Sequence, residues 1–367
     1  MQNKFKNKKI VAFLIPCLGP GGMERVMSEL VNYFSKKNSI VLHLIIYGKR
    51  KDVFYDIPDR VKIHYPDFEF NDKHRLWCTI KTLLFLRKLI SQICPDSILS
   101  FGEYWNSLVL LSLLFKNEKI YISDRCRPDK SLGMIHDVLR FVLYKKAKGV
   151  VVQTRQAYEI YSKFISGEKI KTIGNPIRNI VVEDIEEKED IVLSVGRLIH
   201  TKHHDELIKL FVRIGRPDWK LVIVGDDALK QNNMIRLKEL IKELGAEHTV
   251  ELAGNRTDVD DYYRKSKIFA FTSSSEGFPN VIGEAMAAGL PVISFDCIAG
   301  PSDMITNKED GYLVPLFDYD TYRTRLEDLM NNGVLREKMG QMAKINIKRY
   351  SVQNIGNEYH RLLLSEK

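Results

Sequence analysis

The sequence contains no apolar run that approaches the roughly 20 residues needed for a membrane-spanning helix. Its longest candidate, SLVLLSLLF at residues 107–115, is followed by a lysine. The basic start MQNKFKNKK precedes IVAFLIPCLG, which is more typical of a buried first strand than of a signal peptide. We therefore expect a cytoplasmic protein, with the inner face of the cell membrane as the alternative location.

Cysteine is also scarce. The five cysteines are an odd number without a CxxC spacing, so neither a disulfide framework nor a zinc site is indicated. The sequence has no G-K-[ST] phosphate loop and no D-x-D motif in a suitable turn. In the glycine cluster that begins at Gly19, Glu24 stands where a dinucleotide-binding motif needs its third glycine. NTPases and dehydrogenases thus lose their main support, and we expect chemistry without a metal or cofactor.

Positive charge is concentrated in the first half of the chain. Residues 1–175 hold 30 Lys and Arg against 16 Asp and Glu, or +14, while residues 176–367 hold 26 against 31, or −5. The basic half should face an anionic partner. Because no basic cluster has interleaved aromatic residues, we do not expect that partner to be a nucleic acid.

Strand and helix patterns alternate along the chain. Short β-branched runs such as KIVAFLIP, DSILSFG and IVLSVGR are separated by helical segments, including residues 23–35 and 79–93. This alternation predicts α/β domains with parallel sheets. The alternation of strand and helix patterns is interrupted at GNPIRNIVVEDIEEKED. We expect one domain over residues 1–176, joined by a C-terminal helix at about residues 350–367, and a second over residues 177–349.

The segment SSSEGFPNVIGEAMAAGLPVIS places two glutamates eight positions apart, Glu276 in a loop and Glu284 in a helix. We predict that the helix begins at Pro279, whose fixed φ suits the first helical position. Glu284 would then lie about 7 Å along the helix axis, at ~1.5 Å per residue. That separation suits two contacts with one extended ligand better than a pair of adjacent catalytic acids.

This segment resembles the E-x7-E signature of the family 4 retaining glycosyltransferases, enzymes of the GT-B fold. The similarity also covers LSVGRLIHTKHHDELIKLF, VIVGDD and VELAGNRTDVDDYYRKS, so it extends over about residues 170–320. It implies two facing Rossmann-like domains with a deep cleft between them and a nucleotide-sugar donor held by the second. By resemblance, Glu276 contacts the donor sugar and Glu284 the ribose. The loop and helix start that help to hold the sugar would be Gly277, Phe278, Pro279 and Asn280.

The resemblance also assigns cations to the donor diphosphate. Arg197 and Lys202 follow Gly196 in the turn after a strand, where a guanidinium and an ammonium can hold a diphosphate without a metal. Together with Glu276, these two cations are the predicted catalytic residues. The turn of Gly254, Asn255 and Arg256 falls where the family seats the nucleobase, and uracil is preferred over guanine there.

In the first domain, IPCLGPGGMERVMSEL resembles the GGxER loop of many family 4 enzymes, so Gly21 and Gly22 are expected to approach the donor phosphates. Arg25 could join them, or Glu24 and Arg25 could be charges on a helix surface. ISDRCRP corresponds to a strand end where many relatives carry a histidine that this chain lacks. Ser123 and Arg125 are therefore acceptor-side candidates, with a structural salt bridge as the alternative for Arg125.

The stretch LWCTIKTLLFLRKLISQIC, residues 76–94, combines apolar and basic residues. It could lie on a membrane, but a helix of this kind more often covers a sheet. The charge of +14 favours attraction to anionic lipids or to a lipid diphosphate acceptor. We therefore predict peripheral membrane association as well.

The resemblance implies a retaining, metal-independent, front-face transfer without a protein nucleophile. A hexose or N-acetylhexosamine would move from a nucleotide sugar, with UDP preferred, to a glycan or lipid-linked glycan acceptor in bacterial surface polysaccharide biosynthesis. The alternatives are a UDP-sugar hydrolase or epimerase of the same fold and a non-catalytic nucleotide-sugar-binding protein. The sequence leaves the oligomeric state, the sugar and the linkage open.

Overall fold

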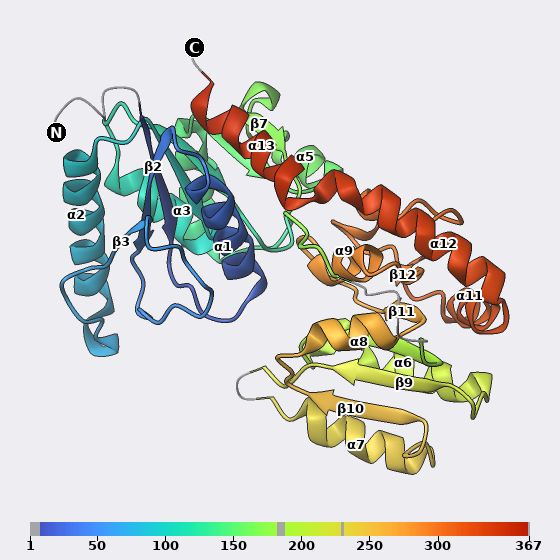
Figure 1. Ribbon diagram of the computed structural model, residues 1–367. Helices are drawn as coiled ribbons and strands as arrows, with labels where there is room; N and C mark the ends of the chain where they lie inside the picture. The colour runs from blue at the N-terminus through green and yellow to red at the C-terminus, as the bar shows by residue number, and fades with distance from the viewer. Residues whose placement is uncertain (1–7, 182–187, 229–230, 366–367) are drawn as a thin grey trace. The chain divides into compact units, whose positions relative to one another are not determined.

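The computed structural model describes residues 8–181, 188–228 and 231–365 (Figure 1). The chain divides into two compact units. Unit 1 comprises Met1–Pro176 together with Val352–Lys367, and unit 2 comprises Ile177–Ser351. Each unit is an α/β domain with one parallel sheet. In the described residues, no helix has both the length and the apolar character needed to cross a membrane.

The sheet of unit 1 has seven parallel strands in the order β3-β2-β1-β4-β5-β6-β7. The strands are β1 Lys9–Ile15, β2 Ile40–Ile46, β3 Lys62–His64, β4 Ser97–Phe101, β5 Lys119–Ser123, β6 Gly149–Val152 and β7 Ile170–Thr172. The α-helices of this unit are α1 Gly22–Ser35, α2 Arg75–Ile93, α3 Glu103–Ser112, α4 Met134–Leu143, α5 Arg155–Tyr161 and α13 Val352–Leu364. Its short 3-10 helices are η1 Asp72–His74, η2 Tyr144–Lys146 and η3 Gly167–Lys169.

The helices of unit 1 lie on both faces of its sheet. The connection from β1 to β2 and those from β3 to β6 run in opposite directions across the sheet, so right-handed crossovers put their helices on opposite faces. α1 packs against α13, whereas α2, α3 and α4 contact one another in series. The Tyr33 hydroxyl of α1 donates to Asn357 Oδ1 of α13 at 2.5 Å. The C-terminal helix thereby belongs to the first unit.

Unit 2 has six parallel strands in the order β10-β9-β8-β11-β12-β13. The strands are β8 Ile191–Val195, β9 Lys220–Val224, β10 Val250–Gly254, β11 Ile268–Phe271, β12 Val292–Phe295 and β13 Gly311–Val314. The α-helices are α6 His204–Ile214, α7 Asn233–Glu243, α8 Val259–Lys265, α9 Asn280–Ala287, α10 Pro301–Met304, α11 Tyr319–Asn331 and α12 Gly333–Asn346. The 3-10 helices are η4 His200–Lys202 and η5 Ile347–Tyr350.

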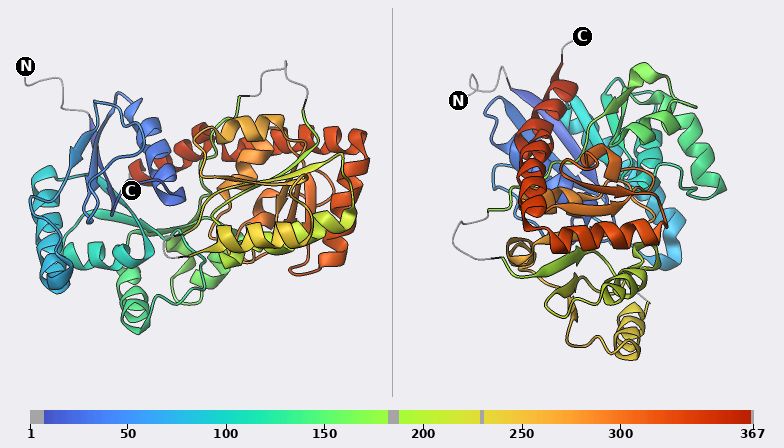
Figure 2. Two further views of the ribbon diagram at one scale, coloured as in Figure 1. Left: turned by 90° about the horizontal axis from the view of Figure 1, so that it is seen from below. Right: turned by 90° about the vertical axis from the view of Figure 1, so that its right-hand side faces the viewer.

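Apolar cores cover both faces of the unit 2 sheet, which Figure 2 shows between helices. Along β8, Val192 belongs to one buried cluster and Leu193 to the other, because successive side chains of a strand point to opposite faces. The first cluster contains Trp219 and the second contains Phe269. A sheet buried in this way is rigid, and only the loops at the ends of its strands remain for ligand binding.

The segment predicted to cover the sheet or to lie on a membrane forms α2. Cys78, Thr82, Leu86 and Ile90 are buried at helical spacing, so α2 does cover the sheet of unit 1. Leu76 and Trp77 in its first turn are exposed.

Candidate active site

The candidate donor site lies where the strand order of unit 2 reverses. β8 leads to β9 and β10 in one direction, whereas β11 leads to β12 and β13 in the other. At such a switch point the loops that follow adjacent strands leave room for a ligand beyond the carboxyl ends. The loop after β8 carries Gly196, Arg197 and Lys202, and the loop after β11 carries residues 276–279. The topology therefore brings together the two segments that the sequence singled out.

The loops after β8 and β9 meet backbone to backbone, which leaves no room for a side chain at Gly225. The Gly196 N–H donates to Val224 O, and the Leu198 N–H donates to Asp226 O, both at 2.9 Å. A Cβ on Gly225, which has φ +149°, would lie 1.9 Å from the Gly196 oxygen. A Cβ on Gly196 itself would lie 3.4 Å from Cε of Lys202. The glycines thus fix the floor over which the lysine side chain lies.

Lys202 and Glu276 form an ion pair at this floor. The Lys202 Nζ lies 2.6 Å from Glu276 Oε1, and the two side chains are only 15% and 13% exposed. The Ser274 N–H donates to Thr201 O at 2.8 Å, and the Thr272 hydroxyl donates to Lys202 O at 2.8 Å, so a backbone bond and a side-chain bond also join the loops after β8 and β11. Two predicted catalytic residues from distant segments therefore meet in a preorganised pair. Arg197 lies exposed at the same turn.

The neighbouring thiol and imidazole are uncharged at neutral pH. Burial, together with the charge of Glu276, raises the pKa of Cys297 to about 12. Burial, with a smaller contribution from Lys202, lowers the pKa of His204 to about 4. The ion pair of Lys202 and Glu276 is therefore flanked by a protonated thiol and a neutral imidazole. Neither neighbour supplies an ionised group to the site.

The helix of the glutamate signature begins one residue later than predicted. α9 is Asn280–Ala287 and Pro279 is its N-cap residue, with φ −81° and ψ 81°. Pro279 is held in this position by the loop after β12, because a Cβ on Gly300 would lie 2.1 Å from its Cδ. Phe278 is buried and packs edge-on against Tyr350, with ring centroids 5.4 Å apart. Pro279 and Phe278 are thus closely packed just before the first residue of the helix, and the half-buried Gly277 precedes them.

Glu284 is buried inside unit 2, where its carboxylate is oriented by two side chains. The Tyr263 hydroxyl donates to Glu284 Oε2 at 3.1 Å, and the Arg178 Nε lies 3.4 Å from Glu284 Oε1. A second nitrogen of Arg178 donates to Asp260 at 2.6 Å. Sequence reasoning missed Arg178, although it stands in GNPIR at the domain boundary. Nothing in its local pattern indicates a partner 106 positions away.

The predicted nucleobase turn follows β10. Gly254 has φ +71° and accepts a hydrogen bond from the Gly225 N–H at 2.9 Å, which ties this turn to the loop after β9. Asn255 is exposed. The Arg256 guanidinium makes a two-point contact with Asp258 at 2.9 and 2.8 Å. Its side chain is thus engaged within its own loop.

The glycine loop of unit 1 connects β1 to α1. Gly21 is the N-cap residue of α1, and Gly22 is its first residue. The Gly21 N–H donates to the Tyr55 hydroxyl at 3.1 Å, and that hydroxyl donates to Gly21 O at 2.9 Å. A Cβ on Gly21 would lie 2.3 Å from a carboxylate oxygen of Glu24. Glu24 therefore folds back over the helix start, as an acidic residue of a first turn often does.

The two acceptor-side candidates have structural partners in unit 1. The Ser123 hydroxyl donates to Val151 O at 2.7 Å. The Arg125 guanidinium lies 3.7 Å from the ring centroid of Phe101 and donates to Asn175 and, at 2.8 Å, to the hydroxyl of Tyr359 in α13. These contacts hold the C-terminal helix through hydrogen bonds and a cation–π contact, whereas the alternative for Arg125 named a salt bridge. Contact of either residue with an acceptor stays a prediction.

A cavity of about 300 Å³ lies at the switch point of unit 1, between β1 and β4. Sequence reasoning missed it. Its lining combines aromatic, basic and acidic side chains with glycines and other residues: Pro16, Cys17, Met23, Gly48, Lys49, Arg50, Gly102, Glu103, Tyr104 and Trp105. The only local signal was the position of these residues directly after predicted strands. The mixture of aromatic faces and charged groups suits a sugar or sugar-phosphate ligand.

Metal ligation has no evident site in the part of the chain that the structure describes. There, no group of three or more His, Cys, Asp or Glu side chains is arranged to hold a metal ion. Besides Glu284 and Arg178, the charged groups at the candidate donor site include Lys202, Glu276 and, at the turn surface, Arg197.

Comparison with known proteins places this fold among glycosyltransferases. Residues 177–346 match the family model described as glycosyl transferases group 1. Over 94% of this chain and 96% of its own length, the amylovoran biosynthesis glycosyltransferase AmsD of Erwinia amylovora is 29% identical. A Campylobacter jejuni N-acetylgalactosamine-N,N'-diacetylbacillosaminyl-diphospho-undecaprenol 4-alpha-N-acetylgalactosaminyltransferase is also 29% identical, over 96% of this chain and 99% of its own.

The fold likewise matches that of a solved structure. A mutant of TarM from S. aureus, crystallised with Fondaparinux, alpha-GlcNAc-glycerol and UDP, superposes with a TM-score of 0.80 at 17% sequence identity. The match covers 97% of this chain and all of that one (100%). The chain thus resembles, over almost its whole length, glycosyltransferases of bacterial polysaccharide and lipid-linked glycan biosynthesis. The fold and these similarities together identify it as an enzyme, a glycosyltransferase of the GT-B fold.

Proposed function

We propose that this enzyme transfers a hexose or an N-acetylhexosamine from a UDP-sugar to a glycan or lipid-linked glycan acceptor, with retention of anomeric configuration and without a metal. The observation that carries the proposal is the ion pair between Lys202 and Glu276 at the switch point of unit 2, with Nζ and Oε1 2.6 Å apart. A cation and a carboxylate fixed beside a helix start match the two ends of a sugar diphosphate. The setting would be bacterial surface polysaccharide assembly.

The donor would lie with its diphosphate toward Lys202 and Arg197. As the bond between the anomeric carbon and the phosphate oxygen breaks, negative charge grows on the departing UDP. Two cations placed there stabilise that charge more strongly than they stabilise the ground state. The Lys202 ammonium can contact the phosphate without releasing Glu276, since it has three donors. No metal is needed for this stabilisation.

Glu276 would accept hydrogen bonds from the hydroxyls of the donor sugar, beside the backbone of Gly277, Phe278 and Asn280. Glu284 would orient the ribose, with Arg178 and Tyr263 holding its carboxylate in place. The backbone of Gly254 and Asn255 would seat the base. That UDP binds in the similar TarM structure supports uracil as the base here.

Transfer would proceed at the front face of the sugar. The acceptor hydroxyl oxygen forms the new bond to the anomeric carbon on the side from which the phosphate departs, and its proton passes to the departing phosphate oxygen. No protein nucleophile takes part, and the high pKa of Cys297 agrees with this assignment. The role of Glu276 is to hold the sugar in an orientation that permits such an attack.

The acceptor would bind at unit 1. The cavity after β1 and β4 offers Tyr104 and Trp105 as surfaces for a sugar ring and Lys49 and Arg50 as cations for a phosphate. The Campylobacter relative acts, by its name, on a sugar linked to diphospho-undecaprenol, and the net charge of +14 over residues 1–175 suits an acceptor of that class. Such an acceptor requires the enzyme to work at a membrane surface.

Calorimetric titration with UDP and with GDP, each in EDTA, tests the donor half of the proposal. We expect UDP to bind more tightly than GDP, and removal of divalent cations to leave its affinity unchanged. Glu284→Gln should weaken UDP binding about 10-fold or more, because a bond to a charged acceptor is worth ~1.5–3 kcal/mol. The same substitution at the exposed Glu239 of α7 is the matched control and should change nothing.

Two outcomes would contradict the proposal. If neither nucleotide binds, unit 2 is not a donor site of the proposed kind. If UDP binds only when a divalent cation is present, the assignment of the diphosphate to Arg197 and Lys202 is wrong. Product analysis without added acceptor completes the test, because rapid release of free sugar from a UDP-sugar would indicate a hydrolase instead.

A further inference from the structure

Helix α4 of unit 1 has its apolar side turned away from the protein. Met134, Ile135, Val138, Phe141 and Val142 are between 51% and 84% exposed. At about 100° per residue these positions fall on one stripe of the helix. A surface helix normally turns such a stripe toward the core, so this helix presents the side that would be expected to be buried.

The inward side of α4 is held by a polar network. Arg140 is buried, lies 3.3 Å from Asp124 Oδ2, and donates to Pro128 O at 3.1 Å. The Tyr144 hydroxyl, in the adjoining η2, donates to Asp124 Oδ1 at 2.6 Å. Tyr161 also bonds both Arg140 and Asp124. Charge and hydrogen bonding thus fix the orientation of the helix, and its apolar stripe is left outside.

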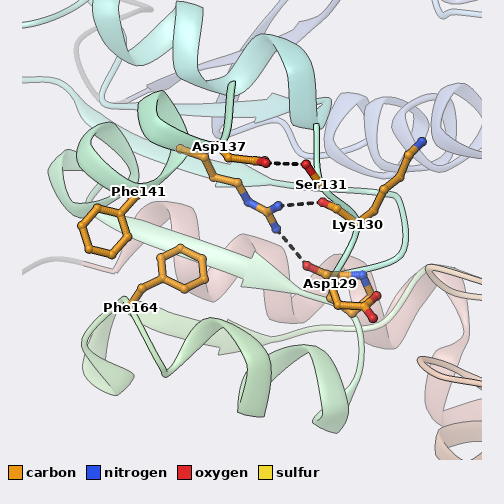
Figure 3. A pocket seen from close by; sticks show the side chains of 8 residues that line it. Asp129, Lys130, Ser131, Asp137, Phe141 and Phe164 are labelled. Atoms are coloured by element: carbon orange, nitrogen blue, oxygen red, sulfur yellow. Dashed lines mark hydrogen bonds between the residues drawn. The ribbon is translucent and has the colours of Figure 1, made fainter. Parts of the chain in front are cut away.

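Lysines lie close to this stripe. The Nζ of Lys145 is 3.8 Å from the centroid of the exposed Phe141 ring. A hollow of about 260 Å³ begins at the same ring, and Lys130 also lines it. Figure 3 shows Phe141 and Phe164 side by side on one side of this hollow, with Lys130, Ser131 and Asp137 on the other. Asp137 is engaged by the Ser131 hydroxyl, and Asp129 is engaged by Arg127.

The apolar character continues into the neighbouring helices on the same face of the sheet. α2, α3 and α4 contact in series, and each follows a strand, so all three begin at the carboxyl edge of the sheet. Leu76 and Trp77 in the first turn of α2 are exposed, and Tyr104 in the first turn of α3 is 38% exposed. Tyr104 also lines the unit 1 cavity at that edge. Apolar surface and candidate acceptor cavity are therefore adjacent.

We propose that the outward stripe of α4, with Lys130 and Lys145 beside it, docks on the surface of an anionic lipid bilayer. This inference rests on the proposed lipid-linked acceptor and names the element that makes the contact. An apolar stripe can enter the boundary between headgroups and acyl chains, while lysines near it meet anionic headgroups. Trp77 and Tyr104, which have apolar bodies and polar tips, suit the same boundary.

A second copy of this chain fits the surface less well than a bilayer does. In a two-fold symmetric pair the same patch lies on both subunits, so Lys130 and Lys145 would approach their own copies. The nearby acids, Asp129 and Asp137, are engaged within the chain. Like charges without a counter-charge oppose such pairing. An anionic bilayer supplies the missing counter-charge.

Vesicle sedimentation tests this proposal. The full chain is mixed with vesicles of phosphatidylcholine alone or of phosphatidylcholine mixed with the anionic phosphatidylglycerol. We expect binding to the anionic vesicles and at least tenfold weaker binding to the neutral ones. Replacement of Met134, Ile135 and Val138 by serine should weaken anionic-vesicle binding about tenfold or more. K130Q with K145Q should reduce the preference for anionic vesicles.

A matched control replaces three comparably exposed apolar residues of unit 2 by serine: Ile235, Val334 and Ile345, which are 58%, 79% and 57% exposed. This control should bind vesicles like the parent. UDP calorimetry on every variant separates the two proposals, because the α4 changes leave the donor site untouched. If the α4 serine variant binds UDP normally but no longer binds vesicles, the role of α4 is confirmed. If the parent chain binds vesicles but does not bind UDP, only the donor proposal is overturned.

Any of three results would overturn the docking proposal. The first is that the parent chain binds no vesicles, and the second is that the α4 serine variant binds them as tightly as the parent. The third is that the unit 2 control loses as much vesicle affinity as the α4 variant. Sedimentation velocity of the chain without lipid covers the remaining possibility. A dimer that dissociates in the α4 variant would show that a second copy, and not a bilayer, occupies the stripe.

Discussion

The two units have the same architecture but use their charged side chains differently. In unit 2, Lys202 and Glu276 meet at the ends of two adjacent strands, with side chains that are 15% and 13% exposed. In unit 1, Asp124 stands directly after β5, yet it is buried and bound by Arg140 on α4. The corresponding edge thus carries a partly exposed ion pair, the proposed donor site, in one unit and a buried structural network in the other.

The proposed function accounts for this difference. A sugar diphosphate carries fixed charges, so a site for it gains from cations and carboxylates that are held near solvent. In unit 1 the charges after β5 are used to hold helices, and the candidate acceptor cavity is lined by Tyr104 and Trp105 as well as by charged groups. The comparison predicts that charge removal will damage stability in unit 1 and activity in unit 2.

The largest expected effect is on the stability of unit 1. Arg140→Met removes the partner of the buried Asp124 and leaves its carboxylate without a counter-charge, which costs about 3–5 kcal/mol. Hydrogen exchange followed by mass spectrometry should show faster exchange in α4 and β5, with unit 2 unaffected. Arg60→Met, at an exposed arginine with one 3.4 Å bond, is the control and should change little. Equal exchange in both variants would contradict a structural role for the Asp124 network.

In unit 2 the effect should fall on catalysis. Lys202→Met should lower the rate of transfer about 10²–10³-fold, the range for loss of one donor that stabilises developing charge. Combining it with Glu276→Gln leaves no unpaired charge, so the free energy of unfolding of the double variant should stay within about 1 kcal/mol of the parent. Lys209→Met, at a surface pair with Glu206, should leave transfer unchanged.

A large loss of stability in that double variant would remove the contrast between the units. It would mean that the pair of Lys202 and Glu276 holds the loops together, as the Asp124 network does in unit 1. Normal transfer by Lys202→Met would instead remove the catalytic assignment.

The fold was largely predictable because alternating strands and helices leave a strong pattern. The predicted parallel sheets are confirmed. The predicted helix at residues 79–93 falls within α2, although α2 begins earlier, at Arg75. The start of α9 was wrong by one residue, because packing of Gly300 against Pro279 is a tertiary contact that no local pattern contains. Side-chain partners such as Arg178 with Glu284 were equally invisible for the same reason.

The candidate site divides in the same way. The residues of the donor site stand in recognisable motifs, and the structure brings Lys202 and Glu276 together; their catalytic roles stay predictions. The unit 1 cavity and the outward stripe of α4 were not predicted. Periodicity reports that a helix has an apolar side, but it does not say which way that side faces. For α4 the direction is set by Arg140 and its buried partners.

Low pH should lower the folding stability of both units, and a different histidine is responsible in each. The pKa of His204 is lowered from 6.5 to about 4, because burial disfavours the charged ring. The unfolded chain therefore binds more protons between these two values, so unit 2 is most stable above pH 6.5 and loses about 3 kcal/mol as pH falls to about 4. His204→Gln should flatten this pH dependence in unit 2 alone.

Unit 1 has its own acid-sensitive group and serves as the internal control. Burial lowers the pKa of His43, which stacks on His64, to about 4 as well. Hydrogen exchange at pH 7, 5.5 and 4.5 should therefore show both units weakening in the parent chain. In the His204→Gln variant, only unit 1 should keep its full loss of stability as the pH falls. An unchanged slope in unit 2 would mean that other groups dominate its acid response.

The smallest expected effect tests how the base is bound. Arg256 makes a two-point contact with Asp258, and the two side chains are 44% and 40% exposed. If the backbone of Gly254 and Asn255 seats the base, Arg256→Ala should change UDP affinity less than twofold, or about 0.4 kcal/mol. A loss of tenfold or more by calorimetry would mean that Arg256 leaves Asp258 to contact the nucleotide. The donor site would then depend on a charge that rearranges, whereas the pair of Lys202 and Glu276 is already in place.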